Sequence, residues 1–145
     1  MILGQRIRID PNNVQATFFD RCAGTARFAF NWGLGLWQTQ YEAGDRPSWV
    51  KLNGELNSIK AIEFPWMTEL PWAVVNKALS DLGSAFTHFF RRVKQGTGKV
   101  GYPRFKSKKR TNPAFAVEGK ALQFDGRKVK IPKLGWVHTS GPLSS

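Results

Sequence analysis

The residues best suited to chemistry in this chain of 145 residues form the stretch GYPRFKSKKR, residues 101–110. Five cationic side chains lie there beside Tyr102, Pro103 and Phe105, and the stretch holds no acidic residue. Cationic side chains bind the phosphates of nucleic acids without regard to base sequence, and aromatic rings among them can stack on unpaired bases. The stretch therefore predicts contact with a nucleic acid.

The charge of the whole chain supports the same partner. It holds 22 Lys and Arg against 10 Asp and Glu, a net charge of +12, as expected of a protein that neutralises phosphates. No Asp or Glu occurs from Leu82 to Val117. Binding to an anionic membrane would need clustered basic residues opposite a broad apolar helical face. The basic residues are placed otherwise, so we expect no membrane partner.

Other functions are disfavoured by what the sequence lacks. The N-terminal MILGQRIRID has two arginines where a signal peptide needs a continuous apolar core, so we expect a cytoplasmic protein. Cys22, His88 and His138 are too far apart for a recognisable zinc site, and we expect Cys22 to be a small buried residue. The acidic residues are scattered, so none can be assigned to metal-assisted cleavage. We expect no catalytic residue, no metal ligand and no cofactor in this chain.

The first third of the chain predicts a strand followed by helix. Residues 3–9 alternate between apolar and cationic side chains, as a half-buried strand does. Asp10 and Pro11 end the strand and begin a helix, with Asp10 as its N-cap. Apolar residues then recur towards Tyr41, the first of them at intervals of four: Val14, Phe18, Cys22 and Ala26. Because of the glycines in this stretch, one helix and two helices broken near Gly24 both stay open.

Two further helices are predicted after a loop at residues 42–48. Trp49, Leu52, Leu56 and Ile59 have the three-four spacing of an amphipathic helix, and EFPWMTELPW then breaks the pattern with two prolines. The clearest helical signal is an apolar stripe that recurs over six turns. It consists of Trp72, Val75, Leu79, Leu82, Phe86, Phe89 and Val93.

After Gly96 the helical period ends, and short strands are predicted at residues 114–117, 121–124, 128–131 and 136–139. Asp125-Gly126 is a hairpin-turn signal between two of them. The sequence therefore predicts an α+β fold with helices inserted after the first strand. Its parts are the first strand (1–10), an inserted helical lobe (11–98), a basic linker with the remaining strands (99–139) and a tail (140–145).

Six motifs follow one another along residues 1–137. They are a strand ending in a proline, RFAFNWGL, EFPW, LSDLGSAFTHFFRR, GYPRFKSKKR and IPKLGWV. The series resembles the N-terminal part of the TnpB/OrfB-type transposon proteins, which are related to the compact type V CRISPR nucleases. The resemblance implies a small barrel-like wedge domain with a helical recognition lobe inserted after its first strand. It also implies that this part binds guide RNA, reads a short motif beside the target DNA and contacts the guide–target heteroduplex.

The resemblance and the charge together nominate site residues. We expect contacts to phosphates or to the RNA scaffold from Arg6, Arg8, Arg91, Arg92, Lys99, Arg104, Lys106, Lys108, Lys109 and Arg110, with His88 beside them. Reading of the target-adjacent motif is expected from Asn76, Lys77 and Ser80, because Asn suits adenine and Lys suits guanine. An ordinary solvated helix face is the alternative for these three.

The aromatic and amide residues of the motifs leave fewer clear roles. Tyr102 is a candidate for base stacking. Packing beneath the sheet of the barrel is the alternative for Tyr102, and for Phe105 we favour such packing over stacking. Asn31 and Trp32 match the R-x-x-x-N-W element of the family, and we expect Trp32 in the core and Asn31 as a buried hydrogen-bonding residue.

Full members of the family continue into a RuvC-like nuclease and a zinc ribbon, and neither occurs in this sequence, so this polypeptide alone is not expected to cut DNA. Two hypotheses remain: the nucleic-acid-binding half of an RNA-guided DNA endonuclease whose nuclease half is missing, or a stand-alone DNA- or RNA-binding module such as a repressor or transposon remnant. A generic helix-turn-helix regulator would not explain the strands. Whether the sequence ending HTSGPLSS belongs to a truncated or frameshifted product, a fragment or a natural small protein stays open.

Overall fold

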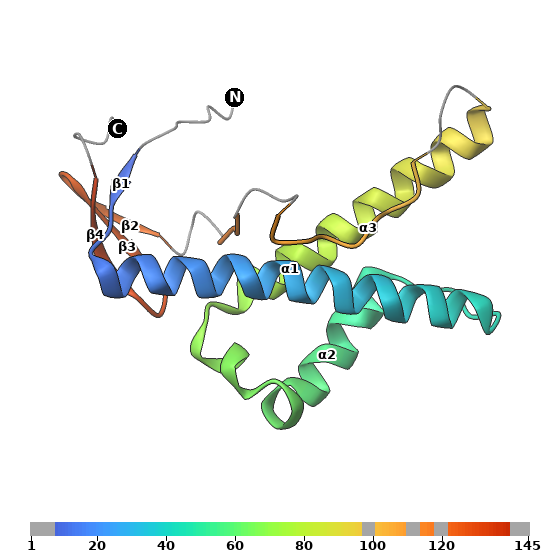
Figure 1. Ribbon diagram of the computed structural model, residues 1–145, viewed down its shortest axis with the longest axis horizontal. Coiled ribbons are helices and arrows are strands. Elements are labelled where there is room, and N and C mark those ends of the chain that lie inside the picture. The colour runs from blue at the N-terminus through green and yellow to red at the C-terminus, as the bar shows by residue number, and fades with distance from the viewer. Residues whose placement is uncertain (1–7, 97–100, 110–113, 118–121, 140–145) are drawn as a thin grey trace.

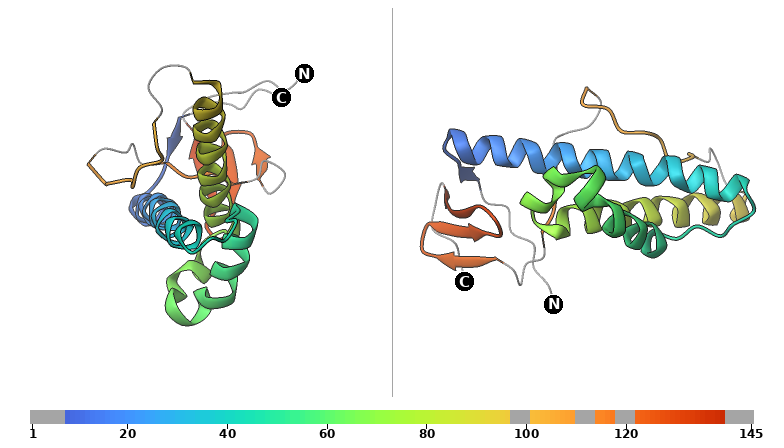
Figure 2. Two further views of the ribbon diagram at one scale, coloured as in Figure 1. Left: turned by 90° about the vertical axis from the view of Figure 1, so that its right-hand side faces the viewer. Right: turned by 90° about the horizontal axis from the view of Figure 1, so that it is seen from below.

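The structure is a computed structural model that describes residues 8–96, 101–109, 114–117 and 122–139. These residues contain three α-helices, one 3-10 helix and the four strands of an antiparallel sheet (Figure 1). In Figure 2 the sheet lies against the N-terminal half of the first helix, and the other helices lie along the rest of it. The predicted α+β class is confirmed.

Helix α1 (Asn13–Glu42) is a single helix of 30 residues, so the alternative of two helices broken near Gly24 is wrong. The predicted N-cap is also wrong, because the residue that caps the helix is Asn12 instead of Asp10. The Asn12 side chain accepts a hydrogen bond from the Gln15 backbone N–H (2.8 Å), and the Gln15 side chain accepts one from the Asn12 N–H (3.0 Å). This reciprocal capping box satisfies two backbone donors that the first turn would otherwise leave unpaired.

Helix α3 (Trp72–Gln95) packs closely on α1 because a glycine lies at their contact. A Cβ atom added to Gly33 would lie 2.7 Å from Cδ2 of Leu79 and 2.9 Å from Cδ2 of Leu82. Gly33 therefore allows an approach that a larger residue would obstruct, at the expense of helix propensity. Helix α3 ends at Gly96, whose φ of 65° is the left-handed conformation that commonly terminates helices.

The apolar stripe predicted for α3 is confirmed in its middle and wrong at its ends. Trp72 is 61% exposed and Val93 is 53% exposed. On α1, Val14 and Tyr41 are exposed as well. Periodicity identifies the apolar face of a helix but not how far the neighbouring helices cover it. The residues of the stripe that are buried are Val75, Leu79, Leu82 and Phe86.

Helix α2 (Trp49–Glu63) and the 3-10 helix η1 (Pro65–Glu69) connect α1 to α3. Ser48 caps α2, as its hydroxyl oxygen accepts a hydrogen bond from the Lys51 N–H at 3.3 Å. The helix predicted after the loop at residues 42–48 is therefore confirmed, and the two prolines that interrupt the pattern lie at the start of η1 and directly before α3.

The sheet has the order β1-β4-β3-β2, and every neighbouring pair is antiparallel. The first strand therefore joins strands from the other end of the chain, as predicted. Strands β1 and β2 are the two edges, so the described strands form an open sheet, and the expected barrel closure is not seen among them. The strands are β1 (Ile9–Asp10), β2 (Gln123–Asp125), β3 (Lys128–Ile131) and β4 (Gly135–Thr139).

One predicted strand is absent, since residues 114–117 form no strand, and residue 121 lies outside the described part of the chain. Phe115 instead stacks on Phe19 of α1, with 5.7 Å between ring centroids. Phe115 and Val117 both pack against the apolar cluster that the helices share with the sheet. The short apolar run is thus explained by side chains that pack on the helical layer.

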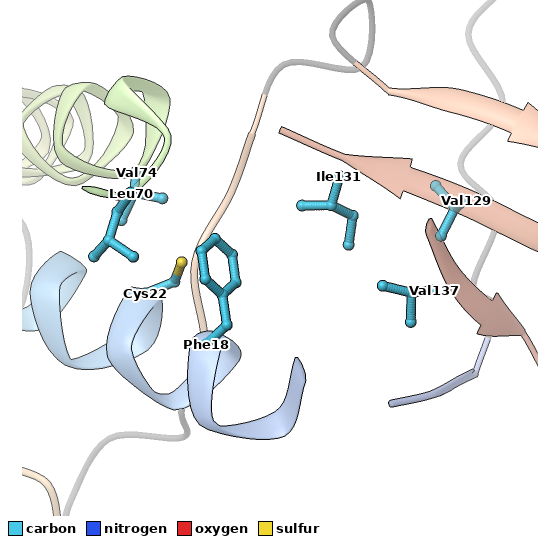
Figure 3. Packing of buried hydrophobic residues seen from close by; sticks show 7 residues of the cluster. All are labelled: Phe18, Cys22, Leu70, Val74, Val129, Ile131 and Val137. Carbon is cyan, nitrogen blue, oxygen red and sulfur yellow. The ribbon is translucent and has the colours of Figure 1, made fainter. Parts of the chain in front are cut away.

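The sheet and the helices share one apolar cluster (Figure 3). Phe18 and Cys22 come from α1, Leu70 and Val74 from the region where α3 begins, and the strands contribute Val129, Ile131 and Val137. Cys22 is buried as predicted, and burial raises the pKa of its thiol to about 11. Because the sheet contributes to this cluster, it is packed directly on the helices.

Candidate nucleic-acid interface

The predicted nucleic-acid stretch is hydrogen-bonded to helix α1 through the side chain of Asn31. We name residues 101–109 the basic strap. Asn31 of α1 donates from Nδ2 to the Lys106 carbonyl oxygen, and its Oδ1 accepts from the Lys106 N–H, each at 2.7 Å. Both backbone groups of Lys106 are thereby paired with a residue 75 positions away. The prediction that Asn31 makes hydrogen bonds is confirmed, although its side chain is half-buried instead of buried. Trp32, expected in the core, is also half-buried and packs against the core clusters.

Two side chains of the basic strap face the helices. Tyr102 lies edge-on to Phe86 and Phe89 of α3, with centroid distances of 5.5 and 5.1 Å. The Lys106 ammonium lies 4.3 Å from the centroid of the Phe30 ring on α1, a cation–π contact. Tyr102 therefore makes its aromatic contacts within the protein, and Lys106 combines a positive charge with a structural role.

The other side of the basic strap faces solvent. Phe105 is 56% exposed, so the expectation that it packs beneath the sheet is wrong. The physical reason lies in its neighbours: Tyr102 and Lys106 occupy the contacts with the helices, and Asn31 fixes the backbone orientation beside Phe105. The nominated cations Arg104, Lys108 and Lys109 are exposed on the same segment.

The remaining nominated cations divide between two regions. Arg91 and Arg92 are exposed in the last turns of α3, close to Phe89, which contacts Tyr102. Arg91 donates from Nη2 to Nδ1 of His88 at 2.8 Å. Arg8 is exposed and directly precedes β1 in the sequence. Strand β1 lies with the other strands at one end of the molecule (Figure 1). The other nominated cations, Arg6, Lys99 and Arg110, lie outside the described residues.

The three residues nominated for motif reading lie together. Asn76, Lys77 and Ser80 line a hollow of about 240 Å³ between α3 and residues 116–117. Two of them already have partners in the protein. Asn76 accepts from the Asn53 side chain at 3.0 Å, and the Lys77 ammonium lies 2.9 Å from Oδ1 of Asp81. The hollow brings the predicted residues to one place, and their part in reading DNA stays a prediction.

A second hollow, of about 260 Å³, lies between α1, α3, the basic strap and residues 114–116. Arg27, Lys77, Lys106 and Asp81 line it together with five alanines and a few apolar side chains. Arg27 is not among the nominated residues, although it is the arginine of the R-x-x-x-N-W element. Arg27 precedes Asn31 by one helical turn, so both face the same side of α1.

Other kinds of site find no support in the part of the chain that the structure describes. No group of three or more His, Cys, Asp or Glu residues there could hold a metal ion. Within the same residues, no helix is long and apolar enough to cross a membrane.

Comparison with known proteins supports the resemblance that rests on the motifs. A family model named HTH_OrfB_IS605 and described as a helix-turn-helix domain matches residues 1–46. In this structure the described residues of that match form β1 and the single helix α1, followed by a turn. A protein of Escherichia coli (strain K12) named "Putative RNA-guided DNA endonuclease InsQ" is 30% identical over 135 residues, which cover 91% of this chain and 32% of InsQ.

The chain thus spans about a third of the length of InsQ. The match at the N-terminus and the identity over nearly the whole chain agree with the ordered motifs of the sequence. This chain is related to the N-terminal part of the TnpB/OrfB-type transposon proteins.

Proposed function

We propose that this chain binds guide RNA and the DNA beside a target, as the nucleic-acid-binding portion of an RNA-guided DNA endonuclease of the TnpB/OrfB type. The observation that carries the proposal is the basic strap, which is fixed to α1 by Asn31 and presents cations to solvent. The name of its relative InsQ supports the same class of activity.

The basic strap suits phosphate binding because its backbone is already ordered. The Asn31 side chain is hydrogen-bonded to both the N–H and the carbonyl oxygen of Lys106. The exposed side chains of Arg104, Lys108 and Lys109 therefore extend from a fixed segment. A preorganised segment loses less conformational entropy when it binds than a free loop does. The described part of the strap and the end of α3 hold no carboxylate that would repel a phosphate. Each neutralised phosphate releases counterions, so binding should weaken steeply with salt.

The hollow lined by Asn76, Lys77 and Ser80 is our proposed place for reading the DNA motif. Lys77 would exchange its contact with Asp81 for a base edge, and Asn76 would keep its hydrogen bond with Asn53 as a support. Competition with Asp81 makes unselective phosphate binding by Lys77 less favourable, which suits a residue that recognises bases.

We infer that the chain binds without cutting, and that cleavage needs a nuclease part such as the one that full members of the family carry. A second candidate function is a stand-alone binding module without chemistry. The observation that favours it is the apolar cluster shared by the helices and the sheet, which gives the described residues a core of their own.

Reversing charge on the basic strap tests the proposal. The double variant Lys108→Glu/Lys109→Glu should weaken binding to structured RNA and reduce the slope of log affinity against log salt by roughly 1 to 2. The matched control is Arg46→Glu/Lys51→Glu, which changes the net charge equally in and before α2. Equal slopes in both variants would show that the strap is not the binding surface.

A further inference from the structure

Phe105 is a large apolar side chain that is exposed on a strongly basic segment of the chain. It is 56% exposed, and the described residues place no aromatic ring against it. Its neighbour Arg104 is exposed, as are Lys108 and Lys109 three and four residues further on. An exposed ring flanked by exposed cations offers a stacking surface beside phosphate-binding groups, which suits a ligand that is both flat and anionic.

The surroundings of Phe105 are fixed before any ligand binds. The adjoining residue Lys106 is paired through its N–H and its carbonyl to Asn31, and its ammonium rests on the Phe30 ring. Tyr102 holds the start of the basic strap on α3 through Phe86 and Phe89. The ring of Phe105 is therefore attached to a segment held at both ends.

We propose that Phe105 stacks on an unpaired nucleobase whose neighbouring phosphates are bound by Arg104, Lys108 and Lys109. The proposal rests on the proposed function and deepens it, since it assigns unpaired nucleotides to the basic strap. A base supplies a flat apolar face and a phosphate on either side, which matches a ring flanked by cations. The paired bases of a duplex present no free face, so a double strand would contact only the cations.

Complementary charge distinguishes this ligand from an apolar protein surface. A protein partner would have to place acidic side chains around the ring to match Arg104, Lys108 and Lys109, whereas a nucleic-acid strand carries a phosphate at every nucleotide. The ligand is therefore a single strand, and either RNA or DNA supplies the required chemistry.

The test measures the binding of the whole chain to a single-stranded RNA, a single-stranded DNA of the same sequence, and the corresponding RNA duplex. Phe105→Ala should weaken single-strand binding by roughly 5- to 150-fold, the range typical of one stacked base, and leave duplex binding and the salt slope unchanged. Phe105→Trp should bind a single strand about as tightly as the wild type. Phe105→Leu, whose side chain is apolar without a ring, should bind as weakly as Phe105→Ala. Equal losses on RNA and DNA would identify the base as the ligand, and a loss on one strand type would identify that strand.

Trp136 provides the matched aromatic control, because it is 41% exposed on the sheet and directly opposite Lys130. The inference would be overturned if Phe105→Ala left single-strand binding unchanged, or if only Trp136→Ala weakened it. It would also be overturned if Phe105→Leu bound a single strand as tightly as Phe105→Trp. In each of these cases the wild-type chain still binds RNA, so the proposed function would stand. Wild-type binding without salt dependence would instead overturn the proposed function, and the inference with it.

Discussion

Replacing Asn31 by alanine removes the two hydrogen bonds that join the basic strap to α1. Two hydrogen bonds of 2.7 Å are lost at a partly buried position, and each is worth about 1 kcal/mol net. Alanine returns about 0.6 kcal/mol because it favours the helix more than asparagine does. We therefore expect the free energy of unfolding to fall by about 1 to 2 kcal/mol.

The assay combines denaturant unfolding with hydrogen exchange at the Lys106 amide. That amide is protected only if Asn31 accepts from it, so exchange should become faster in Asn31→Ala. Asn31→Asp is the matched variant, since it keeps the acceptor for the Lys106 N–H and loses the donor to the Lys106 carbonyl. It should retain amide protection and lose stability. Unchanged exchange at Lys106 in Asn31→Ala would refute the proposed role of this contact.

Two further predictions concern the core. In Gly83→Ala a Cβ atom would lie 2.6 Å from Cδ1 of Trp49, so an overpacking cost of about 1 to 3 kcal/mol should outweigh the gain in helix propensity. In Gly35→Ala the added Cβ would meet nothing within 4 Å, so the free energy of unfolding should rise by about 0.5 to 1 kcal/mol. Melting temperatures that shift in the same direction in both variants would contradict this packing. Burial raises the pKa of Cys22 from 9.0 to about 11, so the thiol loses its proton at lower pH in the unfolded chain than in the folded one. The free energy of unfolding should therefore fall as pH rises from about 9 to 11. In Cys22→Ala it should depend less on pH in this window, and the same pH dependence in both proteins would argue against the buried thiol.

Much of the fold could be predicted because it follows from local patterns. Strand β3 was predicted with its exact bounds, and α2 and α3 began where expected, since short-range alternation and three-four spacing identify such elements. The continuity of α1 could not be decided locally. Gly33 lowers helix propensity locally. The glycine is needed because Leu79 and Leu82 of α3, which are distant in the sequence, lie so close to it that a Cβ atom would clash.

The site shows the same division. Charge alone identified the basic strap, because phosphate binding depends on the number and sign of exposed groups. The direction in which Phe105 points depends on Asn31, which lies more than 70 residues earlier and pairs with Lys106. No local pattern around Phe105 contains that information, so its exposure could be found only in three dimensions.

The most direct test of the central claim is a salt titration of the purified chain with the structured RNA encoded beside its own gene. An unrelated RNA and a duplex DNA serve as controls. The account predicts tight binding that prefers the encoded RNA and weakens steeply with salt. Weak binding that is equal for all three nucleic acids and disappears at moderate salt would contradict it.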